Sequence, residues 1–176
     1  MPMLTDLAKS LLQCTHNIQQ DLRTLSLPPS DITAAVGNSV LPYGLFKKCR
    51  RGYIQKVVHQ INHTYTNTCY DACAVMIRRL IETLIIEVFE AHKLDHKIKQ
   101  STGEFQYLES LINAAVNESV WNLGRNAKKA MERLKKLGDA SAHNRRWNAH
   151  REYIDELKDD LRTVSHELIA LAKMDN

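Results

Sequence analysis

Apolar residues recur every three or four positions along most of the chain, which is the spacing of one face of an α-helix. The first such stretch, residues 4–25, has one apolar face and one polar face; the apolar positions are Leu4, Leu7, Leu11, Ile18, Leu22 and Leu25. Pro28 and Pro29 then end the helix, because proline lacks a backbone donor and forces the preceding residue out of helical geometry. We predict an N-terminal amphipathic helix within residues 1–27 and a connector over 28–46 with room for one short helix.

Residues 47–176 repeat the helical spacing in five further segments. These are expected near 53–63, 67–92, 104–117, 124–137 and 148–173. The second is the most apolar and should be the central, most buried helix, with Asn67 or Thr68 as its N-cap. Gly138 fits a C-cap for the fourth segment, and residues 93–103 should form a charged turn. The fold class predicted from this pattern is all-α, a single domain of five to six helices around one core.

Composition and charge restrict the class of protein to which this bundle belongs and its expected location. The 176 residues include few aromatics, glycines and prolines, which favours helices over strands. The net charge of +4 permits contact with a phosphate backbone without requiring it. No stretch approaches the roughly 20 apolar residues of a membrane span, and the acidic start is unlike a secretory signal. We therefore expect a cytoplasmic protein with no membrane partner, whose cysteines at positions 14, 49, 69 and 73 are free thiols.

One short segment, residues 137–144, gathers reactive side chains between two predicted helices. It holds Asp139, Ser141, His143 and Asn144, and two arginines follow it directly. A histidine can move a proton near neutral pH and an arginine can hold a phosphate, so this combination suits metal-free phosphodiester chemistry. The structural alternative is that Asp139 caps the following turn and His143 packs and hydrogen-bonds between the helices.

Two other groupings are candidates for a site. In Arg78-Arg79-Leu80-Ile81-Glu82, charges three and four residues apart share a helix face and can form an ion pair, which would bear on function if that face lies opposite His143. His59-x3-His63-x5-Cys69-x3-Cys73 has four side chains that could bind zinc. Its spacing matches no standard zinc module, and both cysteines fall on the apolar stripe, so we expect buried thiols, surface imidazoles and neither a metal nor another cofactor.

Two runs considered together, Tyr70 to Leu84 and Leu137 to His143, resemble a domain of unknown function within the HEPN superfamily. That branch typically carries an Arg-Arg-x-x-Glu helix and a Gly-Asn/Asp-x-x-Ala-His motif, and the similarity covers roughly residues 47–172. The resemblance implies an all-α bundle that commonly dimerises, often in bacterial defence, toxin or stress systems. Many superfamily members are metal-independent ribonucleases.

The ribonuclease signature of the superfamily is an arginine, a polar residue, three variable positions and a histidine. Its histidine falls on His143 and its polar residue on Asp139, but Gly138 stands where the arginine is expected. The missing cation could come from elsewhere in the chain, with the candidates being Arg78, Arg79, Arg145 and Arg146. Arg145-x4-His150 also has the signature spacing, but we interpret it as a chance match because this branch places its histidine where His143 stands.

Two functional hypotheses follow. In the first, the protein is RNA-directed, with endoribonuclease activity as its catalytic form: His143 transfers the proton, Asp139 orients it, and an arginine binds the scissile phosphate across a homodimer cleft. The RNA contacts would come from Arg78, Arg79, Asn144, Arg145 and Arg146, and Glu82 would form a structural ion pair. In the second, the protein is a non-catalytic dimerising adaptor or an antitoxin-like partner of a protein from the same operon. Loss of the arginine argues against strong catalysis.

Overall fold

The computed structural model describes residues 13, 15 and 39–174. The predicted helix over residues 4–25 and most of the predicted connector lie outside the described residues. Contacts divide the chain into two units, Met1–Ala35 and Val36–Asn176, and every helix that has defined bounds belongs to the second. The all-α prediction is confirmed for the described residues, where the only β-type pairing is an isolated bridge between Lys99 and Phe105.

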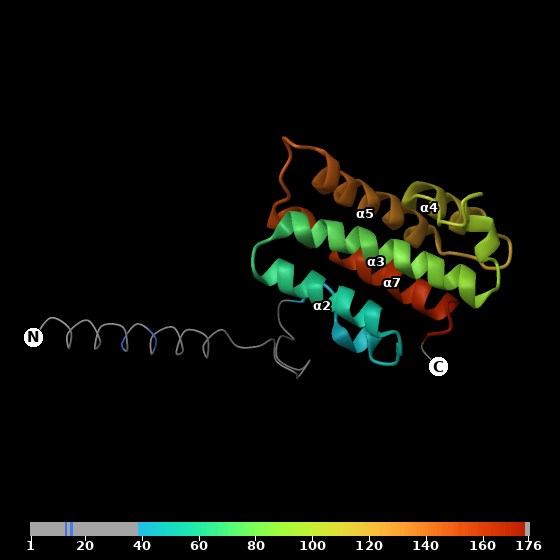
Figure 1. Ribbon diagram of the computed structural model, residues 1–176, viewed down its shortest axis with the longest axis horizontal. Coiled ribbons are helices and arrows are strands. Elements are labelled where there is room, and N and C mark those ends of the chain that lie inside the picture. The colour runs from blue at the N-terminus through green and yellow to red at the C-terminus, as the bar shows by residue number, and fades with distance from the viewer. Residues whose placement is uncertain (1–12, 14, 16–38, 175–176) are drawn as a thin grey trace, which may run out of the picture. The chain divides into compact units, whose positions relative to one another are not determined.

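Six α-helices and two short 3-10 helices make up the described part of the second unit (Figure 1). In chain order they are η1 (Tyr43–Phe46), α2 (Gly52–Thr66), α3 (Tyr70–Ala91), η2 (Asp95–Ile98), α4 (Leu108–Asn117), α5 (Arg125–His143), α6 (Arg151–Glu156) and α7 (Lys158–Leu171). None of the helices in this described part is both long and apolar enough to cross a membrane.

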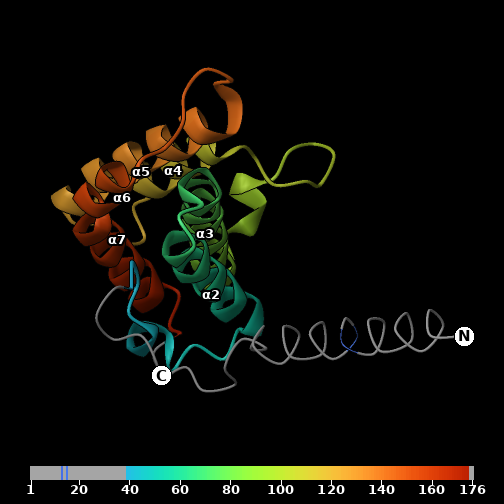
Figure 2. The same ribbon diagram turned by 90° about the vertical axis from the view of Figure 1, so that its left-hand side faces the viewer.

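Helix α3 is the centre of the bundle. It packs against α2, α5 and α7, and Figure 2 shows these helices arranged around it. Ten of its residues are buried, among them Ile77, Leu80, Leu84 and Phe89, which are at most 1% exposed. Removing this much apolar surface from water is the main favourable term in folding. The prediction of a central, most buried helix is therefore confirmed.

Several element boundaries differ from the sequence expectation. Helix α5 does not end at Leu137: it runs through Gly138 to His143, so Gly138 is not a C-cap. The last predicted helix is divided into α6 and α7 at Leu157, whose backbone leaves helical geometry (φ −103°, ψ 3°). Cys69 rather than Asn67 or Thr68 precedes α3, and no side chain caps its first turn.

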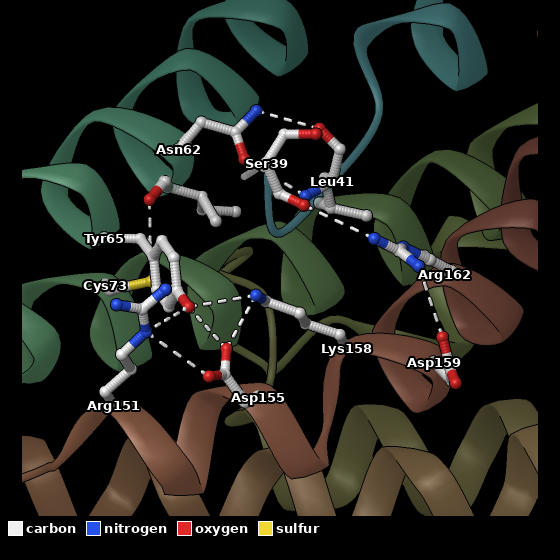
Figure 3. A network of polar contacts seen from close by, with 11 residues as sticks. Ser39, Leu41, Asn62, Tyr65, Cys73, Arg151, Asp155, Lys158, Asp159 and Arg162 are labelled. Atoms are coloured by element: carbon white, nitrogen blue, oxygen red, sulfur yellow. Dashed lines mark hydrogen bonds and ion pairs between the residues drawn. The ribbon is translucent and has the colours of Figure 1, made fainter. Parts of the chain in front are cut away.

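The end of the predicted connector belongs to the folded core. Val40, Leu41 and Phe46 are at most 2% exposed. The amide of Asn62 on α2 holds Leu41 in both directions, accepting from its N–H at 3.0 Å and donating to its carbonyl at 2.8 Å (Figure 3). Arg162 on α7 donates to the carbonyl of Ser39. These bonds attach residues 39–41 to two helices, which no local sequence signal indicated.

Candidate functional site

Gly138 marks the closest approach of α5 to α3. A Cβ atom at this position would lie 2.6 Å from Cβ of Arg78 and 3.2 Å from the carbonyl oxygen of Ala74, both on α3. Real Cβ atoms do not approach other atoms so closely, so glycine allows the two helices to pack at this distance. The position where the HEPN signature has its arginine is therefore buried in this protein, and any side chain there would be directed into α3.

Charged side chains close over this helix contact, and we call Arg78, Glu82, Lys135 and Asp139 the clasp. Arg78 Nε donates to Asp139 Oδ1 at 2.8 Å, and Lys135 Nζ lies 2.9 Å from Asp139 Oδ2. Arg78 also pairs with Glu82 at 3.6 Å, as the sequence predicted. Lys135 itself was not singled out from the sequence, although its spacing of four residues from Asp139 on one helix is a recognisable signal.

The clasp balances two cations against two carboxylates. Burial raises the pKa of Asp139, but the hydrogen bonds from Lys135 and Arg78 lower it by more, so the carboxyl has a pKa below its ordinary value. The same hydrogen bond raises the pKa of Lys135. Because Arg78 contacts the carboxylates of both Asp139 and Glu82, its positive charge is compensated within the protein.

His143 lies one helical turn beyond Asp139 on the same side of α5. No hydrogen bond joins the two side chains, and within the described residues the imidazole of His143 has no partner. It is exposed rather than packed between helices, and Asp139 binds Arg78 and Lys135 instead of capping a turn. His143 therefore follows the clasp residue Asp139 by one turn of α5, but its ring is exposed to solvent.

Residues 144–150, the α5–α6 loop, have a defined backbone that presents two arginines. Asn144 Oδ1 accepts from the N–H of Arg146 at 3.1 Å, so its side chain builds the turn. At the other end, the N–H of Ala149 donates to Asp71 on α3 at 2.9 Å. Arg145 and Arg146 are exposed, and no ion pair joins either to a described residue. Both guanidinium groups are thus available to an anion.

The remaining candidate arginine, Arg79, lies apart from the clasp. It is exposed on α3, whereas its neighbour Arg78 contacts α5. Successive residues on a helix are about 100° apart, which explains why only one of the pair can reach Asp139. No ion pair within the described part of the chain involves Arg79. The structure brings together Arg78, Glu82 and Asp139 from the predicted set, and does not bring Arg79 to them.

A second polar cluster was missed by the sequence reasoning: Tyr65, Arg151, Asp155 and Lys158, the tyrosine cluster (Figure 3). The hydroxyl of Tyr65, a residue only 3% exposed, donates to Asp155 and accepts from Arg151 Nε and Lys158 Nζ, each at 3.0 Å. The pairs of Arg151 and Lys158 with Asp155 are local, but Tyr65 lies 90 residues from Asp155, so no spacing connects them.

The possible zinc ligands do not converge. His59 and His63 stack on one another with ring centroids 5.9 Å apart. Cys73 is fully buried, and burial raises the pKa of its thiol to about 12. Cys69 is exposed, so the expectation that both cysteines lie in the core was wrong for Cys69, which precedes α3 instead of facing inward. Over residues 39–174, no three His, Cys, Asp or Glu side chains are grouped as a metal would require.

Comparison with known proteins finds no protein-family model, no curated protein and no solved structure that matches this chain. The resemblance to the HEPN superfamily therefore stays a prediction that rests on the two motifs quoted above.

Proposed function

We propose that this protein is a cytoplasmic RNA-binding module of the HEPN type that binds RNA at the C-terminal end of α5 and cleaves it poorly. The observation that carries the proposal is the contrast between the arginines: Arg145 and Arg146 are exposed and have no ion pair with any described residue, whereas Arg78 is paired with two carboxylates. His143 lies just before the two exposed arginines in the chain.

Arginine is well suited to this task. Its planar guanidinium forms two parallel hydrogen bonds with a phosphate and stays charged at any physiological pH. Arg145 and Arg146 are adjacent in a loop whose two ends are fixed by Asn144 and by the bond from Ala149 to Asp71. A loop held in this way loses little conformational entropy when it binds, so more of the phosphate interaction contributes to affinity.

Poor cleavage follows from Gly138. Removing one group that stabilises a developing oxyanion typically costs on the order of 3 kcal/mol of transition-state stabilisation, or 10² to 10³ in rate. Arg78 covers position 138, but its guanidinium is bound to Asp139 and Glu82. His143 can still transfer a proton, yet no cation is fixed beside it on the helix. Binding without efficient turnover is the expected result.

The proposal is tested by binding and cleavage measured together. Fluorescence anisotropy with labelled RNA should show binding by the wild type, a loss of tenfold or more in Arg145→Gln/Arg146→Gln, and little change in His143→Ala. The control Lys48→Gln/Lys56→Gln removes two exposed charges elsewhere and should bind almost as the wild type does. Equal losses in both double variants would contradict a site at the end of α5.

Cleavage is then measured with total RNA in EDTA, beside His143→Ala. We expect slow cleavage or none, and no large difference between the two proteins. Rapid cleavage by the wild type that disappears in His143→Ala would show that the centre is complete and overturn the part of the proposal that concerns turnover. Binding and turnover can therefore fail separately.

A second candidate function is a dimerising adaptor or antitoxin-like partner in a bacterial defence or toxin system. It is favoured by the outer face of α3, where Ala72, Val75 and Arg79 are exposed at spacings of three and four residues and Val75 is 37% exposed. A helix face of this kind can pack against a second copy. Sedimentation should show a dimer that Val75→Glu converts to monomers; a monomeric wild type would argue against this candidate.

A further inference from the structure

Helix α5 carries a row of exposed cations that leads to His143. Arg125, Lys129 and Lys136 are all exposed, and at 100° per residue they and His143 lie within about 40° of one another around the helix. We call these four residues the cation stripe. Two acidic residues lie within about 40° of His143 on this face: Glu132, which is exposed, and Asp139, whose carboxylate binds Arg78 and Lys135.

The basic residues of α5 form two groups that differ in their position around the helix. Those beside the stripe have partners: Lys135 binds Asp139, Arg133 binds Asp160, and Lys128 donates to the carbonyl of Val116. The three cations of the stripe have no ion pair or hydrogen bond with any residue that the structure describes. The charges that neighbouring helices neutralise are therefore separated from those left to solvent.

Helix stability does not explain this arrangement. The positive end of a helix dipole favours acidic residues in the first turn; α3, α4 and α6 each have one there and α7 has two, whereas α2 has none. Helix α5 has none; it begins with Arg125, and Lys129 follows one turn later. Arg125 therefore opposes the dipole of its own helix, and a role outside the folded protein accounts for this cation better than a role in folding.

We propose that the cation stripe is the track of a single-stranded RNA backbone that runs along α5 to His143 and the α5–α6 loop. This inference rests on the proposed function, and it adds a direction and a length to it. From Arg125 to His143 the helix rises about 27 Å. At about 3.4 Å per nucleotide of a stacked strand, that distance spans roughly eight nucleotides.

The inference predicts a dependence on RNA length. Oligoadenylates of about four nucleotides reach from His143 to Lys136, whereas those of about eight nucleotides also contact Lys129 and Arg125. Each phosphate contact with a single strand contributes about 0.7 to the slope of log affinity against log salt. One contact therefore strengthens binding about fivefold at 0.1 M salt relative to 1 M salt. Two contacts should therefore strengthen binding on the order of 25-fold, with a plateau beyond roughly eight nucleotides.

The test compares Arg125→Gln/Lys129→Gln with Lys48→Gln/Lys56→Gln, using fluorescence anisotropy with labelled oligoadenylates at two salt concentrations and thermal melts to confirm folding. We expect the first variant to bind the four-nucleotide probe as the wild type does and the eight-nucleotide probe about 25-fold more weakly. Its salt slope should fall by about 1.4. The control variant should keep the wild-type length dependence.

The outcomes separate the track from the proposed function. If the wild type binds RNA through Arg145 and Arg146 but the Arg125→Gln/Lys129→Gln variant keeps the full length dependence, the track is overturned and the proposed function stands. A uniform loss at every length also overturns the track, because it indicates only the general charge of the protein. If the same variant binds a blunt RNA duplex more weakly by an equal factor, the cation stripe does not select a single strand, which contradicts a single-stranded substrate. If the wild type binds none of the probes, both proposals fail.

Discussion

The clasp and the tyrosine cluster use the same charges in different ways. In each, one aspartate lies between an arginine and a lysine: Asp139 between Arg78 and Lys135, and Asp155 between Arg151 and Lys158. The clasp surrounds a contact in which a glycine lets two backbones approach. The tyrosine cluster surrounds a buried hydroxyl that all three charged groups contact. The comparison indicates that such a charge pattern does not by itself mark a reactive site.

The two clusters should also differ in the interaction that joins their helices. Helices α3 and α5 pack closely at Gly138 whether or not the clasp is intact, so its ion pairs add a modest term to an existing contact. In the tyrosine cluster, the hydroxyl of Tyr65 is itself the link between α2 and the segment that contains α6 and the start of α7. Removal of this hydroxyl oxygen takes away the hydrogen-bond partner that three charged groups share, so those groups would have to rearrange.

The largest effect is expected from Gly138→Ala. Its new Cβ would clash with Arg78 and Ala74 on α3, and overpacking of this kind typically costs about 2 kcal/mol of unfolding free energy. Urea unfolding measures it. Gly52→Ala is the matched control, because nothing lies within 4 Å of a Cβ placed there and alanine favours helices. Similar stabilities for the two variants would contradict the close approach of α3 and α5.

Tyr65→Phe should have the next largest effect, a loss of about 1.5 kcal/mol, because it removes a buried hydroxyl that donates one hydrogen bond and accepts two. Thermal and urea unfolding would measure the loss. The comparison is Tyr53→Phe on the same helix, where the ring is 47% exposed and no change is expected. A neutral Tyr65→Phe would show that the charged groups hold this end of the bundle without the hydroxyl.

Asp139→Asn should cost less, about 1 kcal/mol, because the clasp is partly exposed to solvent and the helix contact beneath it remains. A double-mutant cycle with Arg78→Met measures the coupling of the pair, which should be of similar size. Asp159→Asn is the control, since it also removes a carboxylate from an ion pair, with Arg162, but its side chain is 94% exposed. A loss in Asp139→Asn as large as that in Gly138→Ala would mean that charge, not packing, joins the two helices.

The smallest effect concerns pH. For Asp155, burial raises the pKa but hydrogen bonds from Lys158 and Tyr65 lower it by more, as Lys135 and Arg78 do for Asp139. A carboxyl with a lowered folded pKa stabilises the protein above its unfolded pKa of about 3.9, and this stability is lost as pH falls further. Asp139→Asn and Asp155→Asn should each flatten the loss of stability below about pH 4.

Glu87 should change the stability of the protein with pH in the opposite direction. It is buried on α3, and burial raises its pKa despite Arg51 nearby. The folded protein therefore holds this proton more tightly than the unfolded chain, so stability decreases as pH rises from about 4.3 through the raised pKa. Glu87→Gln should remove that decrease and leave the acid limb unchanged. Stability curves from pH 2 to 8 distinguish the two kinds of carboxyl.

Sequence periodicity predicted the described helices well because it reports burial along one element. It could not show that α6 and α7 are separate, since Leu157 continues the apolar stripe across the break. Gly138 was misread for a similar reason. A glycine after a basic helical stretch has the local pattern of a C-cap, and only the approach of Arg78, 60 residues earlier, reveals that the helix continues.

The candidate site was predictable to the same extent. The Arg78–Glu82 pair follows from helical spacing, and Asp139 and His143 from their short shared segment. That Asp139 binds Arg78 rather than His143 depends on how two helices cross, which no spacing within one helix contains. The tyrosine cluster joins residues on three helices through one hydroxyl, so it had no signal in the sequence.

The packing at Gly138 also bears on which mutations can accumulate. Arginine at position 138 would meet Arg78 and Ala74, so Gly138→Arg should disrupt the α3–α5 contact. The clash is with the Cβ of Arg78 itself, so only glycine at position 78 would remove it, and that change alone would leave Asp139 with one cation fewer. An arginine at position 138 therefore requires substitutions at both positions, each disadvantageous alone. Epistasis of this kind opposes the appearance of an arginine at position 138.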